Sequence, residues 1–153
     1  MSVTSGKRPG VNAGDSGSVI PRASVVVPVL NGAATIADML AGLAAQGGIA
    51  RSEYEIIVVD GGSTDATREV VSRFPDVTLL DEPRRGPGVA RDTGMRHARG
   101  EIICHLDADS LPSRRWLSSL IAPFSDPSVV VVGGKTLSFP PRTPAQRYMA
   151  DSG

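Results

Sequence analysis

The 153-residue sequence contains a single cysteine, Cys104, and only two histidines. One thiol cannot form an internal disulfide, and the chain has no cluster of Cys and His side chains of the kind that holds a structural zinc ion. A domain stabilised by disulfides or by zinc is therefore excluded. The scarcity of cysteine favours a protein of the cytoplasm.

Net charge and long apolar runs are also missing. Sixteen Lys and Arg balance sixteen Asp and Glu, so no basic surplus draws the chain to nucleic acid or to an acidic membrane. No apolar segment approaches the roughly 20 residues of a membrane-spanning helix, and residues 1–22 lack the apolar core of a signal peptide. We therefore expect no nucleic-acid partner and a cytoplasmic location, including the cytoplasmic face of a membrane, with any membrane attachment carried by residues outside this sequence.

The length suits one domain, since domains commonly contain about 100–150 residues. Hydrophobic residues make up 41% of the chain and charged residues 21%, as in ordinary globular proteins. Residues 1–22 are rich in Gly, Ser and Pro and predict a flexible tail. We expect a core over residues 23–134, followed by an incomplete region over residues 135–153 that has no pattern able to close a sheet.

Short apolar runs alternate with helical patterns along the core. The runs predict strands at residues 24–30, 54–59, 77–80, 101–106 and 129–132. Helices are expected at residues 34–46, 63–74 and 89–98 and after residue 112, with Ser63 as an N-cap. This alternation indicates an α/β fold: a doubly wound, parallel sheet with helices on both faces, whose ligands bind beyond the carboxyl ends of the strands.

Unusual polar residues stand where the predicted strands end. Asn31 follows the first strand, Asp60 the second, and Asp107 and Asp109 the fourth, while Pro28 lies near the end of the first strand because it cannot donate a ladder hydrogen bond. Carboxyl ends of parallel strands share one edge of the sheet. These side chains should therefore converge on one rim.

Two carboxylates, Asp107 and Asp109, lie on the turn after the fourth strand. Such a pair can hold Mg²⁺ or Mn²⁺, which prefer oxygen ligands and complete their coordination with water and substrate phosphates. A diphosphate leaving group would suit the remaining positions, and the metal would neutralise its developing charge. The alternative is that one Asp caps the helix that begins near Pro112.

Asp60 begins the turn Asp-Gly-Gly-Ser-Thr-Asp, in which two glycines let a planar ring approach the backbone. Asp60 can accept hydrogen bonds from a nucleobase or a ribose hydroxyl, and turn formation is the alternative. Asp65, at the end of the same segment, suits turn and helix-start chemistry.

Arg91 follows a Gly-rich segment that leads into a helix, where backbone N–H groups and a guanidinium together favour a phosphate. A cation near a helix start is unfavourable for the helix dipole, so a ligand explains Arg91 more simply. We interpret Arg84 and Arg85 as a solvated surface pair, and His97 as a helix-end residue.

His105, Trp116 and Cys104 are expected to be structural. His105 lies in the pattern of a buried strand and should be hydrogen-bonded in place, and Trp116 shares an apolar stripe with its helix neighbours. Cys104 is expected to be an inert buried thiol.

Taken in order, residues 25–31 (VVVPVLN), 55–65 (EIIVVDGGSTD), 88–94 (GVARDTG) and 100–109 (GEIICHLDAD) resemble the motifs of family-2 glycosyltransferases of the GT-A fold. The resemblance implies transfer of a sugar, with inversion, from a nucleotide diphosphate donor to an acceptor of unknown kind (a glycan, a lipid or a small molecule), using Mn²⁺ or Mg²⁺. It further implies that Pro28 and Asn31 shape the nucleotide pocket and that Asp60 contacts the base or ribose. By the same resemblance Arg91 lies near the diphosphate, Asp107 contacts ribose or sugar, and Asp109 binds the metal.

The sequence departs from the family pattern in two ways. Gly61 stands where the family more often has a second Asp, which leaves the preferred nucleotide open. Family members also continue into an acceptor-binding half that carries the general base, so this residue is expected beyond Gly153, and residues 135–153 are expected to begin that half.

Three other functions compete with this hypothesis. A phosphatase of the haloacid dehalogenase type would use Asp107 and Asp109, but Leu111 stands where that family has Thr or Val, and its motif is usually on the first strand. A dinucleotide-dependent oxidoreductase lacks its Gly-rich turn here. The third alternative is a non-catalytic or truncated module that binds a nucleotide-sugar without transferring the sugar.

Overall fold

Four parallel strands form one sheet, in the order β3-β2-β1-β4, in a computed structural model that describes residues 20–137. The strands are β1 (Ala23–Val29), β2 (Tyr54–Asp60), β3 (Val77–Asp81) and β4 (Ile102–His105). In the β1–β2 pair, Ala23 is opposite Tyr54 and Val29 is opposite Asp60. The central position of β1 and the parallel direction of its neighbours confirm the predicted parallel sheet.

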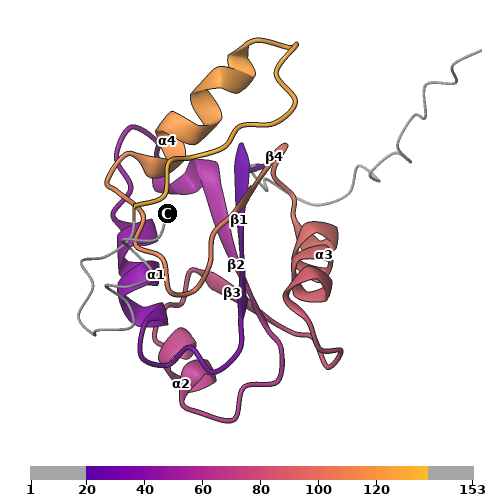
Figure 1. Ribbon diagram of the computed structural model, residues 1–153. Coiled ribbons are helices and arrows are strands. Elements are labelled where there is room, and N and C mark those ends of the chain that lie inside the picture. The colour runs from indigo at the N-terminus through magenta and orange to yellow at the C-terminus, as the bar shows by residue number, and fades with distance from the viewer. Residues whose placement is uncertain (1–19, 138–153) are drawn as a thin grey trace, which may run out of the picture.

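Helices cover both faces of this sheet, which gives three layers (Figure 1). Helices α1 (Ile36–Ala44), α2 (Thr67–Ser72) and α4 (Trp116–Ile121) lie on one face, and α3 (Pro87–His97) lies on the other. Short 3-10 helices at Arg51–Glu53 and Ala122–Ser125 precede β2 and follow α4. The predicted α/β class and layer arrangement are therefore confirmed.

The core follows the alternation of side chains along the strands. Val25, Val27 and Val29 of β1 belong to the cluster on the α1 side, whereas Ile57 and Val59 of β2 pack with α3. Helix α1 contributes four fully buried side chains at helical spacing: Ile36, Met39, Leu40 and Leu43. Burial of each such side chain is worth about 1.5–3 kcal/mol, so α1 is fixed firmly against the sheet.

Gly94 brings α3 close to the sheet. A Cβ at this position would collide with the side chain of Val26 in β1, and it would also lie 3.2 Å from a Val59 methyl. Only glycine permits this approach. Because Arg91 lies one helical turn before Gly94, the close contact also sets the position of Arg91 at the end of the sheet.

The predicted strand at residues 129–132 is wrong. The segment is irregular, and Val130 and Val131 are 83% and 82% exposed. It lines one cavity with β4 residues but makes no ladder hydrogen bonds with them. An apolar run becomes a strand only when it pairs with a neighbour, and among residues 20–137 nothing pairs with the outer edge of β4.

The structure also bears on the expected N-cap at Ser63 and on the expected terminal segments. Ser63 is not an N-cap, because α2 begins only at Thr67 and the Ser63 hydroxyl accepts a bond from the Asn31 N–H. Arg22, within the predicted tail, bonds through its backbone to Glu53 and Ile102. Most of the predicted tail and residues 138–153 lie outside the described residues. No helix within the described range is long and apolar enough to cross a membrane.

Candidate functional site

A pocket of about 610 Å³ lies where β1, β2 and β4 end. Its walls come from four separate segments of the chain: the loops after β1 and β4, the start of the loop after β2, and the first turns of α3. Five of the six candidate site residues line it: Pro28, Asn31, Arg91, Asp107 and Asp109. Asp60, the sixth, does not, but its neighbour Gly61 does, as does Arg85. The sheet therefore brings these residues to one rim.

Arg91 and Asp107 are joined across the pocket wall. The Arg91 Nη2 lies 2.7 Å from the Asp107 Oδ1, and the two side chains are 35% and 61% exposed. A guanidinium held at this place supplies donors for an anionic ligand in the pocket. The pair also leaves the other Asp107 oxygen without a protein partner among the described residues.

Asp109 is exposed, and no hydrogen bond or ion pair joins it to another described residue. Residues 20–137 contain no cluster of three or more His, Cys, Asp or Glu that would hold a metal alone. Mg²⁺ and Mn²⁺ are commonly bound by one or two protein carboxylates, with water and substrate phosphates as the other ligands. The oxygen ligands on the turn after β4 fit such an ion, with Asp109 as the available carboxylate.

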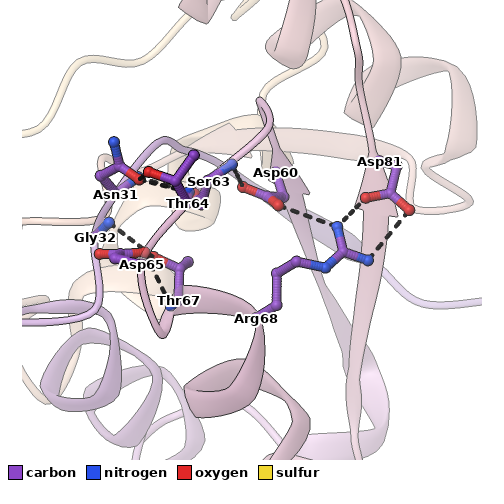
Figure 2. A network of polar contacts seen from close by, with 9 residues as sticks. All are labelled: Asn31, Gly32, Asp60, Ser63, Thr64, Asp65, Thr67, Arg68 and Asp81. Carbon is purple, nitrogen blue, oxygen red and sulfur yellow. Dashed lines mark hydrogen bonds and ion pairs between the residues drawn. The ribbon is translucent and has the colours of Figure 1, made fainter.

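Asn31 adopts a left-handed backbone conformation, with φ 54°, which asparagine tolerates better than most residues. Its N–H donates to the Ser63 hydroxyl at 2.8 Å, and its Oδ1 accepts the Thr64 N–H at 2.8 Å. Figure 2 shows these contacts between the loops after β1 and β2. The Asn31 side chain is therefore hydrogen-bonded to the loop after β2 and holds this wall of the pocket in place.

Two further backbone groups continue this connection. Gly32 N–H donates to the Thr67 hydroxyl at 2.9 Å, and Ala33 N–H donates to the Asp65 Oδ2 at 3.1 Å. The Thr67 hydroxyl and N–H both donate to the other Asp65 oxygen. The Thr67 hydroxyl is the main reason that the pKa of Asp65 is lowered. The expected turn role of Asp65 is confirmed.

Asp60 lies behind the pocket wall and is 1% exposed. Its Oδ1 accepts the Ser63 N–H and its Oδ2 accepts a bond from Arg68 Nη1, both at 3.0 Å. Gly61, the next residue, is the one that lines the pocket. Arg68 was not singled out from the sequence. An arginine in the first turn of α2 is as unfavourable for the helix dipole as Arg91 near the start of α3, so the same signal was present.

Glu82 is a second buried carboxylate near the pocket, 4% exposed. It accepts bonds from the Arg84 N–H, Nε and Nη2 at 2.8–2.9 Å and from the Thr93 hydroxyl. These donors, the Arg84 guanidinium first, lower the pKa of Glu82 to about 2. Arg84 is thus paired rather than simply solvated, and its neighbour Arg85 lines the pocket.

His105 corrects another expectation. It is exposed on β4 rather than buried, and its ring makes no hydrogen bond to another described residue. Partial burial lowers the pKa of His105, the Arg91 guanidinium lowers it further, and the Asp107 carboxylate opposes the shift. A histidine at the end of a short strand lies close to the polar rim, which the apolar pattern of the strand did not reveal. Cys104, by contrast, is buried, and burial raises the pKa of its thiol to about 11.

Comparison with known proteins gives consistent matches. The model of the family described as "Glycosyl transferase family 2" matches residues 24–150. The glycosyltransferase AglE of Haloferax volcanii is 34% identical over 138 residues, which are 86% of this chain and 45% of that protein. The pre-mycofactocin glycosyltransferase of Mycobacterium tuberculosis is 32% identical over 83% of this chain and 26% of that protein. The chain thus spans less than half the length of these relatives.

Solved structures agree. The mannosyltransferase PcManGT of Pyrobaculum calidifontis, in complex with GDP-Man and Mn²⁺, has a TM-score of 0.67 and 39% identity over 73% of this chain and 34% of that one. TarS of S. aureus in complex with UDP has a TM-score of 0.64 and 28% identity, covering 69% of this chain and 32% of that chain. These findings exclude the phosphatase and oxidoreductase alternatives. The chain belongs to glycosyl transferase family 2.

Proposed function

We propose that this chain is the donor-binding part of an enzyme that transfers a sugar, with inversion, from a nucleotide diphosphate sugar to an acceptor of unknown kind. One observation carries the proposal: Arg91, Asp107 and Asp109 share a pocket of about 610 Å³ with the nucleotide-side residues Pro28 and Asn31. A cation site, an anion-binding guanidinium and an adjoining wall are the parts that a diphosphate ester requires. The GDP-Man and Mn²⁺ of the archaeal mannosyltransferase support the same assignment.

Each residue has a separate role in this proposal. Asp109 holds Mn²⁺ or Mg²⁺, which supplies Lewis-acid stabilisation of the leaving diphosphate when bound. Arg91 contacts the diphosphate, and Asp107 accepts hydrogen bonds from ribose or sugar hydroxyls through the oxygen that Arg91 does not occupy. Pro28 and Asn31 shape the nucleotide end. Asp60, which does not line the pocket, supports the base or ribose through the turn that it holds.

Inverting transfer also requires a carboxylate that removes the proton of the acceptor hydroxyl. Asp107 and Asp109 are the carboxylates that line the pocket among the described residues, and both are assigned to the donor. Asp126 is bonded to the N–H and hydroxyl of Ser128, away from the pocket. None of these described carboxylates is assigned this role, and we propose, as the family resemblance implies, that the general base lies beyond Gly153. Slow or no turnover is then expected of these 153 residues alone.

A thermal-shift series tests the site. UDP and GDP are added with and without Mn²⁺ to the unaltered chain and to Asp109→Ala, with Asp126→Ala as the control. We expect metal-dependent stabilisation by at least one nucleoside diphosphate in the unaltered chain and the control, and its loss in Asp109→Ala. Full metal-dependent stabilisation of Asp109→Ala would refute the assignment.

The same preparation separates an enzyme from a binding module. Incubation with UDP- or GDP-sugars and Mn²⁺, followed by chromatography of the nucleotide, measures release of UDP or GDP as the sugar is transferred to water in place of the unknown acceptor. Rapid transfer would contradict the assignment of the base outside this chain. Binding with no release, in this chain and in any longer natural form of it alike, would favour the non-catalytic module.

A further inference from the structure

Arg68 links the ends of two neighbouring strands (Figure 2). Its Nη1 lies 3.0 Å from the Asp60 Oδ2, and both terminal nitrogens bond to the Asp81 carboxylate. Asp60 and Asp81 end β2 and β3 and are opposite each other in the parallel register. One guanidinium therefore fixes two carboxylates at the nucleotide side of the sheet edge.

The two carboxylates depend on Arg68 to different degrees. Asp81 is 69% exposed and is solvated without it, whereas Asp60 is 1% exposed. A buried carboxylate needs a charged or hydrogen-bonding partner, because loss of its solvation is otherwise uncompensated. Arg68 supplies this positive charge to Asp60 through Nη1 alone. The two bonds of its planar fork to Asp81 hold the guanidinium in place beside Asp60, which a single ammonium group would do less firmly.

Asp60 is connected to the pocket by the turn that follows it. The Asp60 Oδ1 accepts the Ser63 N–H, closing a turn over Gly61 and Gly62, the second of which has φ +88°. Gly61 lines the pocket, and the Ser63 hydroxyl accepts the N–H of Asn31, which lines it too. Arg91, Asp107 and Asp109 make no bond to this network.

We propose that Arg68 is a positioning residue for the nucleoside end of the donor pocket; this rests on the donor-binding function proposed above. Arg68 does not line the pocket. It holds Asp60, and Asp60 holds the turn against which the base and ribose lie. The diphosphate end, built from Arg91 and the Asp107–Asp109 turn, is independent of it.

Calorimetric titration with Mn²⁺ present distinguishes the two ends. UDP, GDP and inorganic pyrophosphate are titrated into the unaltered chain, Arg68→Met and Arg68→Lys. The matched control is Arg73→Met, which removes an exposed arginine that ends the same helix and pairs only with exposed Glu69 within the described residues. We expect Arg68→Met to weaken the tighter-binding nucleoside diphosphate by about tenfold or more and pyrophosphate by less than about twofold. Arg68→Lys should recover only part of the loss, and Arg73→Met should change neither affinity.

Two results would overturn the proposal: unchanged affinity of Arg68→Met for the nucleoside diphosphate, or equal weakening of both ligands, which reports general damage to the fold. If Arg68→Met does not fold, Asp81→Asn gives the same test, because it loosens Arg68 without leaving a buried charge unpaired. A smaller loss, again confined to the nucleoside diphosphate, is then expected, and no selective loss would refute the proposal. If the unaltered chain binds pyrophosphate but no nucleoside diphosphate, the proposed function fails first, and this inference fails with it.

Discussion

The guanidinium of Arg91 and the carboxylate of Asp107 meet at 2.7 Å, although one belongs to a helix on one face of the sheet and the other to the loop after β4. Their meeting closes the pocket between α3 and the end of the sheet. It also places a positive charge beside the turn that carries Asp109, the proposed metal ligand.

Replacement of Arg91 by Met should weaken nucleoside diphosphates and pyrophosphate together, each by about tenfold or more, because the lost donors serve the shared diphosphate. The melting temperature should change little, since the Arg91–Asp107 pair is solvent-exposed and such pairs contribute little to stability. Titration calorimetry and thermal unfolding without ligand measure the two effects. Loss of nucleoside diphosphate binding alone would contradict the placement of Arg91 at the diphosphate.

Glu82→Gln should change the pH dependence of stability. The folded-state pKa of Glu82 is about 2, below its ordinary value of 4.5, so the ionised carboxylate stabilises the fold above the ordinary pKa. This contribution is lost as the pH falls from about 5 towards 2. Thermal unfolding at pH 7 should show the variant less stable than the unaltered chain, and the difference should shrink through that window. A difference that stays constant from pH 7 to pH 3 would contradict the assignment.

Gly94→Ala should destabilise the fold by about 1–3 kcal/mol, as overpacking does, because the new methyl group collides with Val26. Gly88→Ala in the same helix is the matched control, since no atom lies within 4 Å of a Cβ there. The control should be neutral or stabilising by about 0.5–1 kcal/mol. Urea unfolding measures both. Pyrophosphate affinity should also fall in Gly94→Ala, because Arg91 moves with α3, and an unchanged affinity would show that this contact does not position Arg91.

The rim of the sheet was predictable because it depends on chain order and strand direction alone. Once the strands are parallel, the residues that follow β1, β2 and β4 lie at one edge of the sheet. Asn31, Asp107 and Asp109 line the pocket there, whereas Asp60 lies behind its wall. The resemblance to the family added their expected roles. Helix α1 was equally predictable, since its apolar positions repeat at helical spacing and all are buried.

Ion pairs between side chains were not predictable in the same way, because they depend on the direction in which each side chain points. The pairing of Asp60 with Arg68 and that of Glu82 with Arg84 follow from how two loops fold back, and neither has a fixed sequence spacing. The irregular segment at residues 129–132 shows the same limit for backbone structure. Its apolar residues satisfy a strand pattern, but a strand also needs a neighbour to bond with, which no local pattern encodes.

Three successive backbone N–H groups, from Asn31 to Ala33, donate to side-chain oxygens of the loop after β2 and of Thr67, the first residue of α2. The hydrogen-bond donors of this wall are therefore satisfied within the protein and do not require a bound ligand. This surface is preorganised, so the protein loses little conformational entropy there when a molecule binds. The ordering that binding requires would then fall on exposed side chains of the pocket such as Asp109.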